Sequence, residues 1–156
     1  RYHGDALDET TVDPGKARSY RSRISGPLLD RIDLHVPVPA VKAKELSLKD
    51  EGEPSEIIRQ RVIASRQRQL QRFDGTGIYS NGEMTNRHLR ELANITTNAE
   101  AALRNAIERL GLSARAHTRS LKVARTIADL EGRSDVGEGD VLEAVSFRDL
   151  DRAGSF

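Results

Sequence analysis

Hydrophobic residues recur every three to four positions through most of the second two thirds of the chain, which is typical of amphipathic α-helices. The pattern predicts helices over residues 56–73, 85–92, 98–110, 114–131 and 138–147. Turn and stop signals separate these segments, among them Asp74-Gly75-Thr76-Gly77 and Asn81-Gly82. The expected N-caps are Ser55, Thr85, Thr97 or Asn98, and Ser113, and the expected stops are Gly111 and Gly132.

The helix after Ser113 carries apolar residues on two sides, and such a helix packs against two neighbours. One stripe holds Ala114, Leu121, Ala124 and Ala128, and the other holds Ala116, Val123, Ile127 and Leu130. We therefore expect this helix at the centre of a small bundle.

The first third of the chain has a different pattern. Residues 1–16 are polar and predict a loop, and the chain starts at Arg1, which indicates a piece of a longer protein. Apolar residues alternate over 32–39 and predict a strand, which Pro37 confines to a sheet edge or a strand end. Because a single strand needs partners, it belongs to a sheet that the chain largely lacks, which disfavours a stand-alone helical interaction module.

The predicted fold is therefore mainly α: a small helical bundle preceded by a loop and one strand left over from an α/β core. The expected divisions are 1–39 for the edge of that core, 40–55 for a linker and 56–150 for the helical domain.

Composition excludes several functions. The chain has no cysteine and a net charge of +1, and no apolar run is long enough to span a membrane, so we expect a cytoplasmic protein. Gly15-Lys16 lacks the upstream Gly and the following Ser/Thr of a P-loop. The four histidines have no metal-ligand spacing, so no metal site is expected. By itself the chain is not expected to be an enzyme.

Charge is unevenly distributed, because residues 56–133 are basic and residues 134–156 are acidic. Arg61, Arg68 and Arg72 fall on one side of the first predicted helix. This basic stripe is compatible with a solvated face, with a contact to a neighbouring subunit or with DNA phosphates.

Two further arginines stand out. Arg115 lies in the first turn of its helix, where a cation costs about 0.3–1 kcal/mol unless an anion is bound there. Arg119 and Lys122 continue the same face. Arg31 precedes the predicted strand and can serve a phosphate on another molecule. The alternatives are a solvated Arg115 and an Arg31 paired with Asp30 or Asp33.

Two segments resemble the ComM/YifB family of magnesium-chelatase-like AAA+ ATPases. They are Ser22-Arg23-Ile24-Ser25-Gly26-Pro27-Leu28-Leu29-Asp30-Arg31-Ile32-Asp33-Leu34 and the segment from Gly111 to Leu130. Residues 77–81 with Glu83 add to the resemblance, which runs from about Arg18 to Arg152. The family is related to the magnesium chelatase I subunit and more distantly to MCM helicases. The family's Walker A, Walker B and sensor-1 segments have no counterpart here.

The resemblance implies that the helical bundle is the AAA+ lid of a ring ATPase, typically a homo-hexamer that uses ATP and Mg²⁺. It implies that Arg31 is an arginine finger acting in trans and that Arg115 is the sensor-2 arginine, with Arg119 a weaker nucleotide-binding candidate. It also implies a DNA motor for branch migration in recombination and competence. A chelatase-type or protein-remodelling ATPase is the alternative. The chain alone is expected to bind no nucleotide tightly and to be a monomer.

Overall fold

A computed structural model describes residues 28, 31–36, 38 and 52–148. Five α-helices and one 3₁₀ helix account for most of this part: α4 (Ser55–Arg72), η1 (Asn81–Glu83), α5 (Asn86–Leu92), α6 (Thr97–Leu110), α7 (Ala114–Leu130) and α8 (Glu138–Ser146). The prediction of a mainly helical bundle is confirmed, and none of the described residues belongs to a named strand.

The predicted strand at residues 32–39 does not form in its described part, residues 32–36 and 38. A strand needs the hydrogen-bonding ladder of a neighbour, and here the backbone bonds to the helical bundle instead. The His35 N–H donates to the Phe147 carbonyl at 2.7 Å. The argument from an orphan strand against a stand-alone helical module therefore no longer holds.

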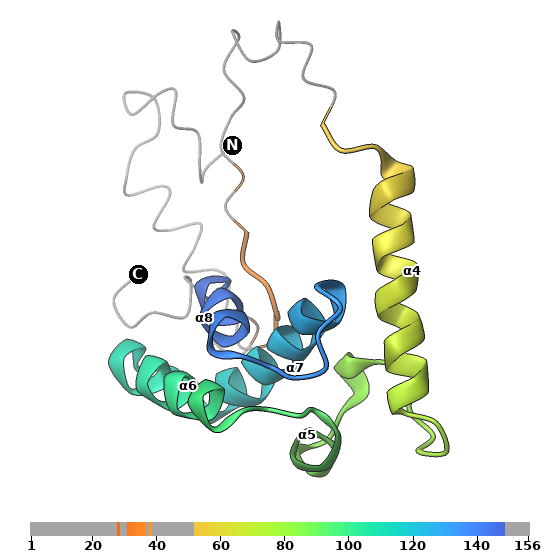
Figure 1. Ribbon diagram of the computed structural model, residues 1–156. Helices are drawn as coiled ribbons and strands as arrows, with labels where there is room; N and C mark the ends of the chain where they lie inside the picture. Colours follow the sequence, from red (N-terminus) through yellow and green to blue (C-terminus); the bar gives the residue numbers. More distant parts are fainter. Residues whose placement is uncertain (1–27, 29–30, 37, 39–51, 149–156) are drawn as a thin grey trace, which may run out of the picture.

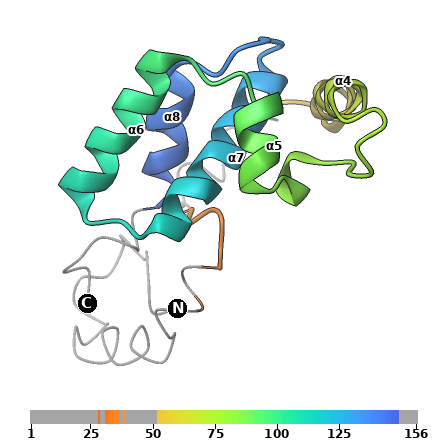
Figure 2. The same ribbon diagram turned by 90° about the horizontal axis from the view of Figure 1, so that it is seen from below.

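Helix α7 is the centre of the bundle, as its two apolar stripes predict, because it contacts α4, η1, α5, α6 and α8. Figures 1 and 2 show α6 and α8 packed along one side of α7 and α5 on the other. Small side chains on α6, α7 and α8 let these helices approach closely in the core. Its fully buried members include Ala99, Leu103, Ala116, Ala124, Ala128, Val141 and Ala144.

Side-chain caps fix the starts of three helices. Thr85 caps α5 in a capping box with His88, and Ser113 caps α7 by accepting from the Ala116 N–H at 3.2 Å. Both were predicted. The cap of α6 is Thr96, one residue before the earlier of the two predicted caps, and Pro54 stands at the N-cap of α4 in place of Ser55. Gly111 ends α6 with a φ of 63°, as expected of a glycine stop.

The loops before α6 and α8 are joined by a short parallel bridge between Ile95 and Val136. Val136 donates to the Asn94 carbonyl at 2.9 Å and accepts from the Thr96 N–H at 3.1 Å. This bridge satisfies backbone groups at the point where both helices begin, and it fixes α8 against α6.

Helix α4 stands apart from the rest, joined to the bundle mainly through its C-terminal half (Figure 1). Its buried residues are polar, Ser65 and Gln69, with Phe73 just beyond its end. Its large apolar side chains are exposed, namely Ile57, Ile58, Val62, Ile63 and Leu70. At helical spacing, Ile58 and Val62 lie on the same face of α4 as Ser65 and Gln69, and they are exposed because the N-terminal half of α4 extends beyond the bundle (Figure 1). Ile63 and Leu70 lie on the opposite face.

Candidate functional site

A cationic cleft of about 510 Å³ lies at the N-terminal end of α7. Three of its side chains come from successive turns of α7: Arg115, Arg119 and Lys122. The spacing of four and three residues puts them on one helix face, as the sequence indicates. Asp33 is the one carboxylate among the residues lining the cleft, and the remaining lining residues are Gly82, Asn86, Ala114 and Thr118.

Arg115 is exposed at the rim of this cleft. Among the described residues, no carboxylate forms an ion pair with it. Its position in the first turn of α7 adds its charge to the positive end of the helix dipole. An anion bound in the cleft would compensate both, so the geometry suits a phosphate-sized ligand.

Arg119 is already engaged within the chain. Its guanidinium forms an ion pair with Asp33, and Nη1 also donates to the carbonyl of Arg31 at 2.9 Å. Lys122 is engaged too, since its Nζ donates to the Gly82 carbonyl at 2.8 Å. Burial lowers the pKa of Lys122 and the charge of Arg119 lowers it further, while the carboxylate of Asp33 opposes both effects.

Arg31 is exposed, and its guanidinium forms no ion pair with any described residue. Its backbone N–H closes a turn by donating to the Leu28 carbonyl at 3.0 Å. Of the two carboxylates expected to pair with it, Asp33 pairs with Arg119 instead, and Asp30 lies outside the described residues. The structure thus brings the Arg31 segment to the cationic cleft through Asp33.

The three arginines of the predicted basic stripe have different surroundings. Arg61 is exposed and forms a two-bond pair with Glu53, at 2.8 and 3.1 Å. Arg68 donates to the Asp129 carbonyl at 3.2 Å, and Arg72 pairs with the Asp129 carboxylate. Arg68 and Arg72 therefore contact α7, and only Arg61 has an exposed guanidinium on this face of α4.

A buried charged cluster joins α4, η1 and α7, and sequence reasoning missed it. Asp129 is fully buried and accepts from Arg72 Nη1 at 2.9 Å, from Arg125 Nη2 at 3.0 Å and from Asn81 Nδ2 at 2.8 Å. The signal available was Arg125 four residues before Asp129 on a helix that is otherwise apolar on two sides. Asn81 looks in sequence like an ordinary Asn-Gly turn residue.

The ionisation of Asp129 reflects these contacts. Burial alone would raise the pKa of its carboxyl group, but hydrogen bonds from Arg72 and Asn81 and the charge of Arg125 hold the pKa below its ordinary value. Arg125 also donates to the carbonyls of Ala93, Arg133 and Ser134 at 2.7–3.1 Å. The cluster therefore fixes the loops that precede α6 and α8.

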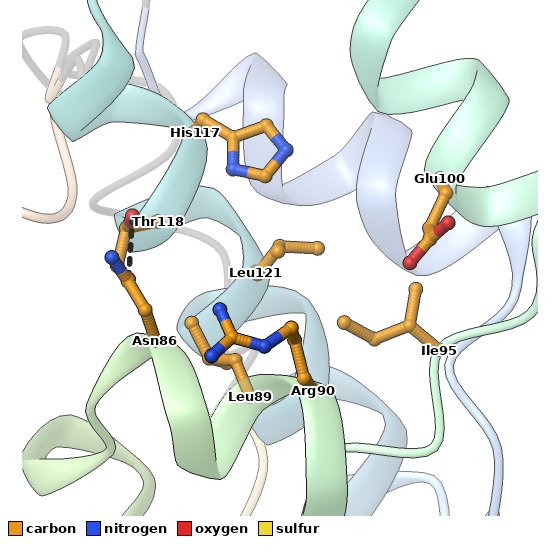
Figure 3. Close-up of a pocket in the computed structure, with 8 residues that line it drawn as sticks. All are labelled: Asn86, Leu89, Arg90, Ile95, Glu100, His117, Thr118 and Leu121. Carbon is orange, nitrogen blue, oxygen red and sulfur yellow. Dashed lines mark hydrogen bonds between the residues drawn. The ribbon is translucent and has the colours of Figure 1, made fainter.

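A second cavity of about 330 Å³ lies between α5, α6 and α7 (Figure 3). Leu89, Ile95 and Leu121 line its apolar part, with Arg90, Glu100 and His117 around them. Asn86 and Thr118, joined by a 3.3 Å hydrogen bond, line both this cavity and the cationic cleft.

Metal and membrane features are absent from the part of the chain that the structure describes. No group of three or more His, Asp or Glu side chains could hold a metal ion there, and no helix is long and apolar enough to cross a membrane. The features that define the site are thus a helical bundle and a cationic cleft.

A helical bundle with such a cleft at a helix N-terminus is the kind of domain that binds anions, and comparison with known proteins places it in a family. Residues 52–148 match the family described as magnesium chelatase, subunit ChlI C-terminal, and residues 2–46 match magnesium chelatase, subunit ChlI. The chain belongs to this magnesium-chelatase-like family, in its ComM/YifB group.

Three relatives illustrate the likeness. The uncharacterized protein Rv2897c of Mycobacterium tuberculosis is 40% identical over 131 residues, which cover 84% of this chain and 26% of the relative. Competence protein ComM of Haemophilus influenzae is 35% identical and YifB of Escherichia coli is 36% identical, each over 140 residues, or 89% of this chain and 27% of the relative. The chain thus spans about a quarter of the length of these relatives.

Proposed function

We propose that this chain is the C-terminal part of a ring-forming AAA+ ATPase and that its cationic cleft meets the phosphates of ATP. The observation that carries the proposal is Arg115, an exposed cation at a helix N-terminus without an ion-pair partner among the described residues. Membership of the magnesium-chelatase-like family supports the ATPase assignment.

Arg115 acts as the sensor-2 arginine in this proposal, and Arg31 acts as the arginine finger on the ATP of a neighbouring subunit in a homo-hexamer. Both guanidiniums stabilise the negative charge that develops on the transferred phosphoryl group. The cationic lining of the cleft fits the phosphates. Asp33 is the one carboxylate lining the cleft, and the described residues hold no cluster of carboxylates that fits Mg²⁺.

The experiment compares ATP hydrolysis by the intact protein with that of Arg31→Ala and Arg115→Ala. Arg31→Ala is expected to lower kcat about 10³-fold or more, the range typical of arginine fingers, while nucleotide binding survives. Arg115→Ala is expected to weaken discrimination between ATP and ADP. Normal turnover in Arg31→Ala would remove the finger assignment, and unchanged discrimination in Arg115→Ala would remove the sensor role.

The client we propose is DNA, in a cytoplasmic motor for branch migration during recombination. The support is the similarity to Competence protein ComM. Arg61 remains a candidate contact to DNA or to a neighbouring subunit, because its guanidinium is on the surface. Arg68 and Arg72 are weaker candidates, since both bond to Asp129.

A chelatase-type or protein-remodelling ATPase is the second candidate, favoured by the match to magnesium chelatase subunit ChlI. The two candidates separate when ATP hydrolysis by the intact protein is measured with and without branched or single-stranded DNA. Stimulation by DNA supports the motor. A rate indifferent to DNA moves the client to a protein or a metal cofactor.

A further inference from the structure

We propose that Arg119 is a positioning residue, which holds the Arg31 segment against α7 so that Arg31 and Arg115 move as one unit. The inference rests on the proposed function for the roles of Arg31 and Arg115. In this inference Arg119 binds the protein's own backbone and Asp33, and it does not contact the nucleotide.

The first support is the double contact that Arg119 makes. Its guanidinium pairs with the Asp33 carboxylate, and its Nη1 donates to the Arg31 carbonyl at 2.9 Å. One planar group thus bridges two alternate residues of the segment. Both bonds come from the two N–H groups of Nη1, which lie in the plane of the guanidinium, so the contact fixes direction as well as distance.

The second support is a separate pair of ties to the end of α8. Arg148 Nη1 donates to the Ile32 carbonyl at 2.6 Å, and the His35 N–H donates to the Phe147 carbonyl at 2.7 Å. Arg148 is almost fully buried, so this tie is protected from water. Figure 1 shows the described part of the segment, in orange, running beside α7 and α8.

Together these contacts hold four nearby residues of the segment, Arg31, Ile32, Asp33 and His35, on two different helical elements. A segment held in this way follows the bundle when the bundle rotates. Arg115 lies one turn before Arg119 on α7. A shift of α7 in response to phosphate at Arg115 therefore moves Arg31 as well.

The third support is the charge balance of the cleft. Asp33 is the one carboxylate lining the cleft, and it pairs with Arg119. Arg119 is therefore already neutralised, whereas Arg115 has no such partner among the described residues. An arriving phosphate meets an uncompensated cation at Arg115 and a compensated one at Arg119.

The test uses Arg119→Gln in the intact protein, with steady-state ATP hydrolysis and amide hydrogen exchange as its readouts. Loss of positioning is expected to lower kcat about 10- to 100-fold, since a displacement of about 1 Å at a reacting centre costs up to 10²-fold. KM for ATP is expected to stay within about threefold. Exchange of the His35 amide is expected to speed up, because its bond to Phe147 loses the neighbouring clamp.

Exchanging the charges of residues 119 and 33 distinguishes a positioning role for Arg119 from a contact with phosphate. Arg119→Asp alone should resemble Arg119→Gln or be worse, and Arg119→Asp combined with Asp33→Arg should recover a large part of kcat. Arg104→Gln, which changes an exposed arginine on α6, is the matched control and should leave both readouts unchanged.

The possible outcomes separate a failure of the positioning inference from a failure of the proposed function. A raised KM with unchanged exchange at residues 31–36, and no rescue by the reversed pair, would mean that Arg119 contacts nucleotide, and the inference would be overturned. Normal turnover in Arg31→Ala would overturn the proposed function and with it the catalytic part of the inference. The exchange measurement would still show whether the clamp exists, so the two failures can be told apart.

Discussion

Helix α4 and the α5–α8 bundle are held together by opposite kinds of interaction. The bundle buries apolar side chains such as Leu103, Val141 and Val145, with small residues at the helix contacts. Helix α4 meets α7 through Arg68 and Arg72 and η1 through Gln69, and it leaves its large apolar residues exposed. The described part of the domain therefore holds four of its helices by apolar burial and the fifth by polar contacts.

The difference shows that apolar residues on a helix do not by themselves indicate an apolar contact with a neighbour. Arg72 and Asp129 pair in a buried position, where the carboxylate gains two further partners, Arg125 and Asn81. A charge buried with all of its partners is tolerated, but removing one partner leaves an uncompensated charge. The orientation of α4 therefore depends on the complete cluster.

The largest expected effect comes from breaking that cluster at its centre. Asp129→Ala should destabilise the domain by about 3–5 kcal/mol, because Arg72 and Arg125 lose their buried counter-charge. Urea unfolding followed by circular dichroism measures the change. Glu131→Ala, two residues later and exposed, is the control and should stay within about 0.5 kcal/mol. A loss below about 1 kcal/mol in Asp129→Ala would mean that the cluster does not anchor α4.

Sequence reasoning found the helices and most of their ends, because period, caps and glycine stops are local signals. Ser113, Thr85 and Gly111 stand where those signals put them. It placed α7 at the centre because two apolar stripes need two neighbours. Local signals carry no information about which distant residue satisfies a charge, so the partners of Asp129 and Arg119 were not found.

The strand expected at residues 32–39 also shows that local signals do not report distant partners. Alternation of apolar residues describes a backbone that can be extended, and the described part is not helical. Whether it becomes a strand depends on a neighbouring ladder, which no local pattern reports. The cationic face of α7 was predicted, since spacing within one helix is local, but the pairing of Asp33 with Arg119 was not.

The next largest expected effect comes from truncating a leucine to alanine in the α5–α8 bundle, for comparison with the same truncation in α4. Leu103→Ala on α6 removes a fully buried side chain and should cost about 2–5 kcal/mol. Leu70→Ala on α4 removes a side chain that is 50% exposed and should cost less than about 1 kcal/mol. Thermal and urea unfolding of the two variants gives the comparison directly. Equal losses would mean that α4 buries Leu70 in solution.

Acid should weaken the charged contacts before the apolar ones. The pKa of Asp129 and that of Asp140 both lie below the ordinary value of 3.8, held down by hydrogen bonds from Arg72 and Asn81 and from Arg133 and Gly137 against the opposing effect of burial. Each carboxylate therefore stabilises the fold fully above about pH 4–5, and this stabilisation is lost as the pH falls through the folded-state pKa.

Urea midpoints measured from pH 7 down to pH 2.5 test this dependence. The carboxylates of Asp129 and Asp140 should change the free energy of unfolding little between pH 7 and pH 5. Below about pH 4 the free energy of unfolding should fall, because the unfolded chain binds more protons than the folded one. Asp129→Ala should show a shallower acid decline than the parent, because one of the two groups is gone. An identical decline would show that Asp129 does not titrate differently in the two states.

The smallest expected effect tests whether the N-terminal half of α4 is free of apolar contacts. Ile58 and Val62 are 41% and 45% exposed, one turn apart, on the N-terminal half of α4 that extends beyond the bundle. Replacing both with glutamine removes little buried apolar area, and glutamine favours helix more than either β-branched residue does. The double variant Ile58→Gln, Val62→Gln should therefore change the free energy of unfolding by no more than about 0.5 kcal/mol. A loss above about 1 kcal/mol would mean that the N-terminal half of α4 packs against another part of the protein in solution. Arg72→Gln, at the other end of the same helix, gives the contrast: it should be destabilising, because Asp129 loses a buried partner.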